Sequence, residues 1–312
     1  MMNTLVISTS SFDIDHNSPL QQLIQKGFRI VTNPHRRKLT EDEIIELLRG
    51  EAVGLIAGIE PLTERVFQAT PTLKVVSRCG AGLDSVDLSA AQDHGVAVLN
   101  TPEAPAQAVA ELTMGLMLSL LRQINQIDQA VRKGEWPRLQ GRLLAAQTVG
   151  IIGIGHIGRR VARLCQAFEA KVIAHDPFAT QVPQGVTLMP LEKLLGSADI
   201  ITLHLPYTPQ THHLLDRKAF ASLKSEAIII NAARGGLIDE CALAEALNSG
   251  RVSAAALDTF EQEPYQGELS TCSNITLTSH VGSLARESRQ RMEIEAAENL
   301  LQGLIRAVLL NE

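Results

Sequence analysis

Short apolar runs, rich in β-branched residues, alternate along the chain with longer amphipathic stretches. The first series of runs covers residues 4–9, 29–33, 53–58, 73–78 and 96–100. The second series covers residues 148–155, 171–176, 199–206, 227–235, 255–260 and 274–280. Because helical patterns separate successive runs, the alternation predicts parallel sheets with helices on both faces. We therefore predict an α/β protein with two doubly wound parallel-sheet domains.

A long amphipathic stretch connects the two series. Its apolar residues recur at intervals of three or four from Val109 to Val131, which predicts one helix that begins near Pro105 and ends near Gly134. This helix is longer than the roughly 12 residues of an average globular helix. Three interpretations fit its length: a linker between domains, a contact with a second subunit, and a crossover helix buried within one chain. Residues 286–308 form another helical pattern, which can return to the first domain.

The composition narrows the class of protein. Of the 312 residues, 45% are hydrophobic and 20% are charged, which is enough for two domains with separate cores. The net charge of -6 lacks the basic excess of nucleic-acid binders, so we expect no nucleic-acid partner. No apolar run approaches the ~20 residues of a membrane-spanning helix, and the N-terminus lacks the basic segment of a signal peptide. We therefore expect a soluble cytoplasmic protein.

The cysteines do not indicate a metal site. Cys79, Cys165, Cys241 and Cys272 lie far apart and form no C-x-x-C pair. This spacing suits neither a zinc site nor a disulfide framework. We expect four reduced thiols and no bound metal.

A glycine motif follows the first run of the second series. Gly153-x-Gly155-x-x-Gly158 comes directly after an apolar strand and opens a helical pattern. In dinucleotide-binding folds the first glycine allows a tight turn, the second lets the backbone approach a pyrophosphate, and the third packs helix against strand. The motif alone is weak evidence, but the strand and the helix around it predict a dinucleotide site.

Asp176 indicates which dinucleotide is bound. It ends the next strand, eighteen positions after Gly158, where a carboxylate accepts hydrogen bonds from the ribose hydroxyls. The carboxylate would repel a 2′-phosphate, and residues 177–181 contain no Arg or Lys to offset that repulsion. The motif therefore favours NAD over NADP. The alternative is a structural turn in which Asp176 only caps the next element.

Polar residues follow three later strands of the second series. Arg234 comes after residues 227–233, Asp258 and Glu263 come after the next run, and His280 ends the last one. In an open parallel sheet these carboxyl ends lie at one edge, where ligands bind. Oxidation of a hydroxy acid needs a cation for the carboxylate, a base for the hydroxyl proton and a partner for the base.

These three residue types meet those needs. Arg234 can hold a carboxylate by two parallel hydrogen bonds. His280 can exchange a proton near neutral pH, and a nearby Glu263 favours the protonated imidazole. Each residue also has a structural interpretation, as a turn anchor, a loop residue or a solvated strand end. Their joint position beside the glycine motif favours the catalytic interpretation.

The motifs around these residues resemble those of the D-isomer-specific 2-hydroxyacid dehydrogenases, in particular the 3-phosphoglycerate dehydrogenase branch. The resemblance covers nearly the whole chain and rests on LKVVSRCGAGLDSVDL, NTPEAPAQAVAELT, GIIGIGHIGRR, INAARGGLIDE, ALDTFEQEP and LTSHVGS. It implies an NAD-dependent enzyme that interconverts a D-2-hydroxy acid and its 2-keto acid. Candidate substrates are 3-phosphoglycerate and related small acids, such as glycerate with hydroxypyruvate, or glyoxylate.

The resemblance also implies an organisation of the chain. Residues 1–100 and 286–312 would form a flavodoxin-like substrate domain, and residues 101–285 a Rossmann domain that binds NAD. The protein would be a homodimer that associates through the NAD-binding domain and the long helix, residues 105–133. Because the chain ends at Glu312, we expect no appended regulatory domain and no serine feedback through one.

Roles for single residues follow from the same motifs. Arg234 resembles the arginine that binds the substrate carboxylate, Glu263 the acid that pairs with the catalytic histidine, and His280 the acid/base. Asp258 resembles the ligand of the nicotinamide carboxamide. The full cofactor set implied is Gly153, Gly155, His156, Ile157, Gly158, Asp176, Leu205, Pro206, Ala232, Ala233, Arg234, Asp258, His280 and Gly282. The substrate set is Arg78, Cys79, Gly80, Ala81, Gly82, Arg234 and His280.

Two positions depart from the family pattern. Ser279 stands where the family usually has proline, which would stiffen the turn before the histidine. Ala81 stands where phosphoglycerate enzymes often have threonine. Arg78 matches an arginine near the substrate phosphate in those enzymes, although a simple salt bridge is an equal alternative.

Two other functions share this fold. Formate and phosphite dehydrogenases are one, but formate enzymes pair the histidine with Gln where this chain has Glu263. An NADH-sensing transcriptional corepressor is the other, and it keeps the same Arg, Glu and His set.

Overall fold

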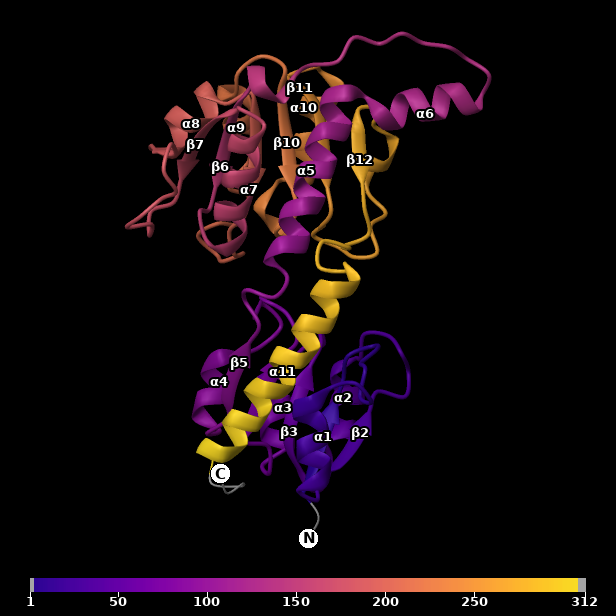
Figure 1. Ribbon diagram of the computed structural model, residues 1–312, viewed down its shortest axis with the longest axis vertical. Helices are drawn as coiled ribbons and strands as arrows, with labels where there is room; N and C mark the ends of the chain where they lie inside the picture. Colours follow the sequence, from indigo (N-terminus) through magenta and orange to yellow (C-terminus); the bar gives the residue numbers. More distant parts are fainter. Residues whose placement is uncertain (1–2, 308–312) are drawn as a thin grey trace. The chain divides into compact units, whose positions relative to one another are not determined.

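The structure is a computed structural model that describes residues 3–307. The chain divides into two compact units (Figure 1). Unit 1 comprises Met1–Pro105 and Leu284–Glu312, and unit 2 comprises Ala106–Ser283. Each unit is built around one parallel sheet.

Unit 1 contains a five-stranded sheet in the order β2-β1-β3-β4-β5. All neighbouring strands are parallel, and the order is that of flavodoxin-like folds, as predicted. The strands are β1 (Thr4–Ile7), β2 (Arg29–Thr32), β3 (Ala52–Ala57), β4 (Val75–Arg78) and β5 (Ala97–Asn100). Helices α2 (Glu41–Leu48), α3 (Glu64–Ala69) and α4 (Leu88–Asp93) bury their apolar sides against one face. Helices α1 (Ser18–Gln25) and α11 (Arg286–Arg306) cover the other face.

The last helix returns to the first sheet, as its pattern allowed. In α11, Leu300 is fully buried and its Cδ1 would lie 2.8 Å from a Cβ at Gly54, so the helix packs closely against that point of β3. Ser77 of β4 donates a hydrogen bond to the carbonyl oxygen of Ala296 at 2.7 Å. The two ends of the chain therefore contribute to one core.

Unit 2 contains a seven-stranded parallel sheet in the order β12-β11-β10-β9-β6-β7-β8. The strands are β6 (Thr148–Ile152), β7 (Lys171–His175), β8 (Thr187–Leu188), β9 (Ile200–Leu203), β10 (Ala227–Asn231), β11 (Val252–Leu257) and β12 (Ile275–Leu277). Helices α5 (Ala106–Arg122) and α7 (His156–Ala167) pack on one face, and α8 (Leu191–Ser197), α9 (Arg217–Ser222) and α10 (Glu240–Asn248) on the other. Short 3-10 helices span Leu144–Ala146, Gly235–Leu237 and Glu268–Thr271.

Side-chain alternation explains why both faces are covered. Ile228 and Ile230 of β10 join the core under α5 and α7, whereas Ile229 joins the core under α8, α9 and α10. Successive strand residues point to opposite faces, so a run of apolar residues needs a helix layer on each side. This confirms the predicted class of two doubly wound parallel sheets.

The prediction of one helix over residues 105–133 is wrong. Two helices, α5 and α6 (Ile124–Arg132), meet at Gln123, whose φ of 53° is left-handed. The break lets α6 turn toward β12, where Asn125 donates a hydrogen bond to Oγ1 of Thr276 at 3.0 Å. Gln126 donates to the carbonyl oxygen of Ser273 at 3.2 Å. Figure 1 shows α6 running past β12 and the loop after it returning to unit 2.

Strand ends also differ from the predicted runs. β11 begins at Val252, before the run that starts at residue 255, and β12 ends at Leu277. His280 therefore lies in the turn after its strand and does not close it. The four cysteines are free, as expected, and only Cys241 is exposed.

Candidate active site

The predicted cofactor and catalytic residues of unit 2 all follow carboxyl ends of its sheet. Because the strands are parallel, these ends lie at the same edge. The glycine motif follows β6, and Asp176 follows β7. Arg234, Asp258 and His280 follow β10, β11 and β12 in the same way.

Each glycine of the motif has a separate structural reason. Gly153 has a φ of 91°, and a Cβ there would lie 2.4 Å from the carbonyl oxygen of His204. A Cβ at Gly158 would lie 2.1 Å from the carbonyl oxygen of Gly153, so this glycine packs α7 against the loop. A Cβ at Gly155 would meet nothing within 4 Å. Neither packing nor backbone strain explains glycine at position 155, but the close approach of a ligand does.

The start of α7 is suited to an anion. Gly155 is the N-cap of this helix and provides no side-chain cap, so the N–H groups of its first turn, from His156 onward, lack intrahelical acceptors. The helix dipole adds partial positive charge at the same point. The open space at Gly155 and the uncapped helix start therefore fit the pyrophosphate of a dinucleotide.

Asp176 stabilises the glycine loop by a hydrogen bond. One carboxylate oxygen accepts a hydrogen bond from the N–H of Ile154 at 2.9 Å, and the other accepts from the N–H of Phe178 at 2.9 Å. Asp176 therefore does have a structural role in this turn, which the sequence left open as an alternative. A carboxylate offers about four acceptor positions, so two remain for ribose hydroxyls.

The structure brings Glu263 and His280 together. Nδ1 of His280 lies 2.9 Å from Oε2 and 3.1 Å from Oε1 of Glu263. Both side chains are partly exposed, His280 by 41% and Glu263 by 36%, so a small molecule can reach the imidazole. The N–H of Phe260 donates to Oε1 of Glu263 at 3.1 Å and fixes the carboxylate.

Hydrogen bonds with Asn231 fix the loop that carries Arg234. This residue is fully buried at the end of β10, and its amide donates to the carbonyl oxygen of Arg234 at 2.7 Å. Its Oδ1 accepts from the N–H of Ala233 at 3.0 Å. Position 235 must be glycine, because a Cβ there would lie 1.9 Å from the carbonyl carbon of Phe260. The loops of Arg234 and Glu263 are thus packed together. Sequence reasoning overlooked Asn231, although a polar residue closing an apolar strand was a usable signal.

Asp258 is nearly completely buried, at 1% exposure. Its Oδ1 accepts hydrogen bonds from Oγ1 of Thr278 at 2.6 Å and from the N–H of Val281 at 2.9 Å. Its Oδ2 accepts from the N–H of Gly282 at 2.8 Å. The carboxylate therefore holds the turn around His280, and one acceptor position on Oδ2 remains for a ligand.

His204 is a second histidine near this edge, directly after β9. Burial lowers the pKa of His204 to about 3, so the ring is neutral at physiological pH. Its Nε2 lies 2.9 Å from Oγ1 of Thr202. His204 is therefore a structural residue and does not compete with His280 for an acid/base role.

The predicted substrate loop of unit 1, residues 78–82, begins at the last residue of β4 and turns after it. Gly80 has a φ of 142°, and its N–H donates to Oγ1 of Thr101 at 2.8 Å. Asn100 donates to the carbonyl oxygen of Ala81 at 2.6 Å. Within residues 3–307, the N–H groups of Ala81 and Gly82 have no hydrogen-bond acceptor. They are therefore available to an anion.

The first two residues of this loop have local roles. Nη1 of Arg78 donates to the carbonyl oxygen of Cys79, so the guanidinium folds over its own loop. Burial raises the pKa of Cys79 to about 11, which makes its thiol unreactive. Cys79 packs in a core cluster of unit 1.

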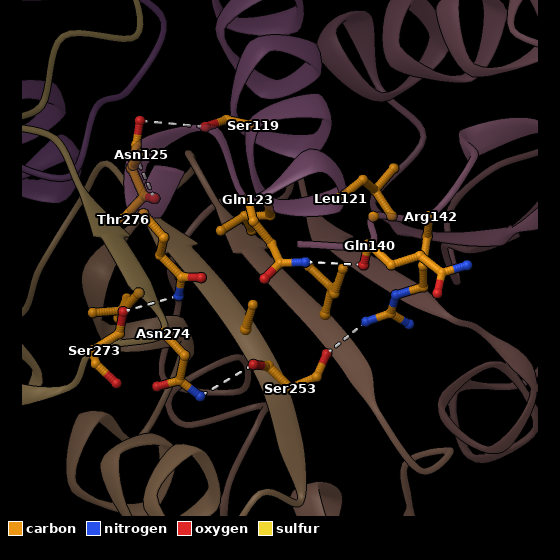
Figure 2. A pocket seen from close by; sticks show the side chains of 16 residues that line it. Ser119, Leu121, Gln123, Asn125, Gln140, Arg142, Ser253, Ser273, Asn274 and Thr276 are labelled. Carbon is orange, nitrogen blue, oxygen red and sulfur yellow. Dashed lines mark hydrogen bonds between the residues drawn. The ribbon is translucent and has the colours of Figure 1, made fainter. Parts of the chain in front are cut away.

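A polar pocket of about 210 Å³ lies elsewhere in unit 2 (Figure 2). Its lining includes Ser253, near the start of β11, and Asn274, just before β12, so it opens at the edge opposite His280. Arg142 is the only charged residue of the lining, and it donates to Oγ of Ser253 at 2.9 Å. Without an acid or a base, this pocket is not a candidate for catalysis.

Within residues 3–307, no group of three or more His, Cys, Asp or Glu residues could hold a metal ion. In the same range no helix is both long and apolar enough to cross a membrane.

Comparisons with known proteins agree with this geometry. Residues 114–282 match the family model for the NAD-binding domain of D-isomer-specific 2-hydroxyacid dehydrogenases. The chain is 38% identical over 299 residues to a hydroxypyruvate reductase of Thermotoga maritima, covering 92% of this chain and 97% of that protein. It is 40% identical over 273 residues to a D-3-phosphoglycerate dehydrogenase of Methanocaldococcus jannaschii, covering 85% of this chain but only 52% of that protein. The crystal structure of a D-lactate dehydrogenase of Aquifex aeolicus, complexed with NAD and lactic acid, is 26% identical with a TM-score of 0.83 and covers 97% of this chain and 96% of that one.

Proposed function

Because the chain belongs to the D-isomer-specific 2-hydroxyacid dehydrogenase family, we propose that it interconverts a small D-2-hydroxy acid and its 2-keto acid, using NAD. The motifs predicted the family, the NAD cofactor and the class of activity, and the comparisons confirm these three predictions. The observation that carries the proposal is the hydrogen-bonded pair of Glu263 and His280 at the same sheet edge as the glycine motif.

The residues present fit NAD. The N–H groups of His156 and Ile157 in the first turn of α7 would hold the pyrophosphate at Gly155, between Gly153 and Gly158, and Asp176 would accept the ribose hydroxyls. Residues that follow the other strands would line the rest of the dinucleotide, namely Leu205, Pro206, Ala232, Ala233, Arg234, Asp258, His280 and Gly282. The bound nicotinamide supplies the carbon that takes the hydride in oxidation and returns it in reduction.

His280 is placed to move the hydroxyl proton. When neutral with its proton on Nδ1, the ring donates to Glu263 and leaves the lone pair of Nε2 free to accept. When Nε2 takes the proton, the imidazolium that forms lies beside the Glu263 carboxylate, which stabilises it. In the reverse direction the same Nε2–H returns the proton to the substrate oxygen.

Arg234 of unit 2 would hold the substrate carboxylate. Arg234 can bind it through two parallel hydrogen bonds, a geometry that lysine cannot reproduce. In unit 1, the loop of Arg78, Cys79, Gly80, Ala81 and Gly82 offers the N–H groups of Ala81 and Gly82 to an anion.

The activity is tested by NADH oxidation with hydroxypyruvate, glyoxylate and 3-phosphohydroxypyruvate. We expect turnover with at least one of these 2-keto acids. Turnover with none of them would refute the proposed reaction. An Arg78→Ala variant, measured beside the wild type, tests whether Arg78 recognises phosphate, because a selective loss with the phosphorylated acid requires that contact.

We also propose that the protein is a homodimer that associates through the arm, which we define as α6 and the loop after it, residues 124–143. Within the described chain no residue of α6 is buried. Ile124, Val131 and Trp136 are exposed by 52%, 44% and 81%. Apolar side chains that gather on one extended segment favour association, and a second copy of the chain would supply the same apolar surface in return.

Oligomeric state is the test of this assembly. We expect the wild type to sediment as a dimer and Val131→Asp to shift the equilibrium toward monomer, because a charge would be buried at the interface. Phe178→Asp is the matched control, since Phe178 is 91% exposed but lies outside the arm. A wild-type monomer, or a Val131→Asp variant that stays dimeric, would contradict the proposal.

The cytoplasmic location also stays a prediction. The four free cysteines are compatible with it.

A further inference from the structure

His280 has a backbone conformation that most residues avoid. Its φ is 56°, in the left-handed region where a side chain with a Cβ is strained. Such a conformation persists only when the surrounding structure enforces it. Ser279 before it is exposed, and within residues 3–307 its N–H has no hydrogen-bond acceptor. Ser279 therefore does not hold the turn, and the proline that would stiffen it is absent.

Residues on both sides of His280 enforce its left-handed conformation, and all of them donate hydrogen bonds to the carboxylate of Asp258. Two positions before it, the hydroxyl of Thr278 donates to Oδ1 of Asp258 at 2.6 Å. One and two positions after it, the N–H groups of Val281 and Gly282 donate to Asp258 at 2.9 and 2.8 Å. Position 282 is also closely packed, because a Cβ there would lie 3.0 Å from Oδ2 of Asp258.

The carboxylate itself cannot move easily. Asp258 is 1% exposed, and its own N–H donates to the carbonyl oxygen of Asn231 at 2.9 Å. Thr278 is also anchored, since its N–H donates to the carbonyl oxygen of Leu257 at 3.0 Å and continues the pairing of β12 with β11. Hydrogen bonds to a buried carboxylate are shorter and stronger than neutral ones. The turn at His280 is thus fixed to the end of β11 on both sides.

We infer that Thr278 is a positioning residue for catalysis: through its hydroxyl, Asp258 holds the left-handed turn that directs His280 to its proton-transfer position against Glu263. This inference rests on the proposed role of His280. In this role the Thr278 hydroxyl stiffens the turn before His280, as a proline at position 279 would. It also gives Asp258 a second task besides its proposed contact with the nicotinamide carboxamide, for which one acceptor position on Oδ2 remains.

Thr278→Val replaces the hydroxyl with a methyl group of similar size and keeps the β-branched shape of the side chain. With hydroxypyruvate, or whichever keto acid of the panel is turned over, we expect kcat to fall about 10-fold, since small displacements of a reacting group are costly. The KM for the keto acid and the Kd for NADH should stay within about twofold, because Arg234 and the glycine loop are untouched. The solvent deuterium isotope effect on kcat should rise, because proton transfer from a poorly held imidazole becomes limiting. Thr278→Ser keeps the hydroxyl and should restore most of kcat.

Thr276→Val is the matched control. Thr276 lies two residues earlier, in β12, and its hydroxyl bonds to Asn125 and not to the site. The kcat and the isotope effect of the Thr276→Val enzyme should therefore equal those of the wild type. A Thr278→Val enzyme with wild-type kcat and isotope effect would overturn the inference, and so would a Thr278→Ser enzyme as impaired as Thr278→Val. A His280→Ala enzyme as active as the wild type, in contrast, would refute the role proposed for the histidine, whatever the threonine variants do.

Discussion

The proposed chemistry depends on one imidazole whose two nitrogens have different tasks. Nδ1 of His280 is bound to Glu263 at 2.9 Å, which leaves Nε2 for the substrate. Glu263 is itself fixed by the N–H of Phe260. A carboxylate in this place orients the ring and stabilises its protonated form, which are the two requirements of a histidine acid/base.

At the same scale, Asp176 is expected to select the cofactor. Asp176→Asn removes the charge that would repel a 2′-phosphate but preserves the shape of the side chain and one acceptor oxygen for the loop. We expect the ratio of kcat/KM with NADPH to kcat/KM with NADH to rise ~10-fold, on the order of one lost charge repulsion. Steady-state kinetics with both cofactors measure the ratio. If it does not change, Asp176 has only its structural role at Ile154 and Phe178.

The sequence placed the candidate site residues at one sheet edge but did not predict their contacts. Arg234, Asp258, Glu263 and His280 could be found because they follow strands whose carboxyl ends must share an edge. The bonds from Thr278, Val281 and Gly282 to Asp258 could not be found, since they depend on the path of one turn. The left-handed backbone of His280 has no signature in residue order either.

Among the elements, the strand-to-helix connection of β6 and α7 shows what each glycine does. Gly158→Ala places a Cβ against the carbonyl oxygen of Gly153 at 2.1 Å, and the close packing of α7 cannot absorb it. Gly155→Ala places a Cβ in open space. The same substitution should therefore have different effects at positions three residues apart.

We expect Gly158→Ala to lower the free energy of unfolding by about 2 kcal/mol. Gly155→Ala should leave that free energy within about 0.5 kcal/mol but raise the Kd for NADH ~10-fold, since the new methyl group occupies the space of the pyrophosphate. Denaturant unfolding and NADH fluorescence titration measure the two quantities. NADH affinity that is unchanged in Gly155→Ala would contradict the placement of the cofactor at this loop.

The limits of periodicity appear in the long helical pattern. Apolar positions continue without interruption from Val109 to Val131, so nothing in the pattern marks the break at Gln123. The break follows from tertiary contacts, because Asn125 and Gln126 bond to residues 276 and 273. Periodicity reports which side chains prefer burial, and it does not report where a helix changes direction.

For the molecule as a whole, the division into two parallel sheets could be predicted because β-branched runs and helical patterns alternate twice. The return of α11 to unit 1 was one of the placements that its pattern allowed, and the buried Leu300 at Gly54 confirms it. Which keto acid is turned over could not be predicted, since the N–H groups of residues 81 and 82 suit any small anion.

The central claim is that His280 transfers the proton beside NAD in a D-2-hydroxyacid dehydrogenase. The most direct measurement compares wild type and His280→Ala in NADH-dependent reduction of hydroxypyruvate or another keto acid of the panel, with the Kd for NADH determined for both. We predict that kcat falls ~100-fold or more in the variant, while NADH still binds because the glycine loop is intact. A His280→Ala protein that reduces the keto acid at the wild-type rate would contradict the account.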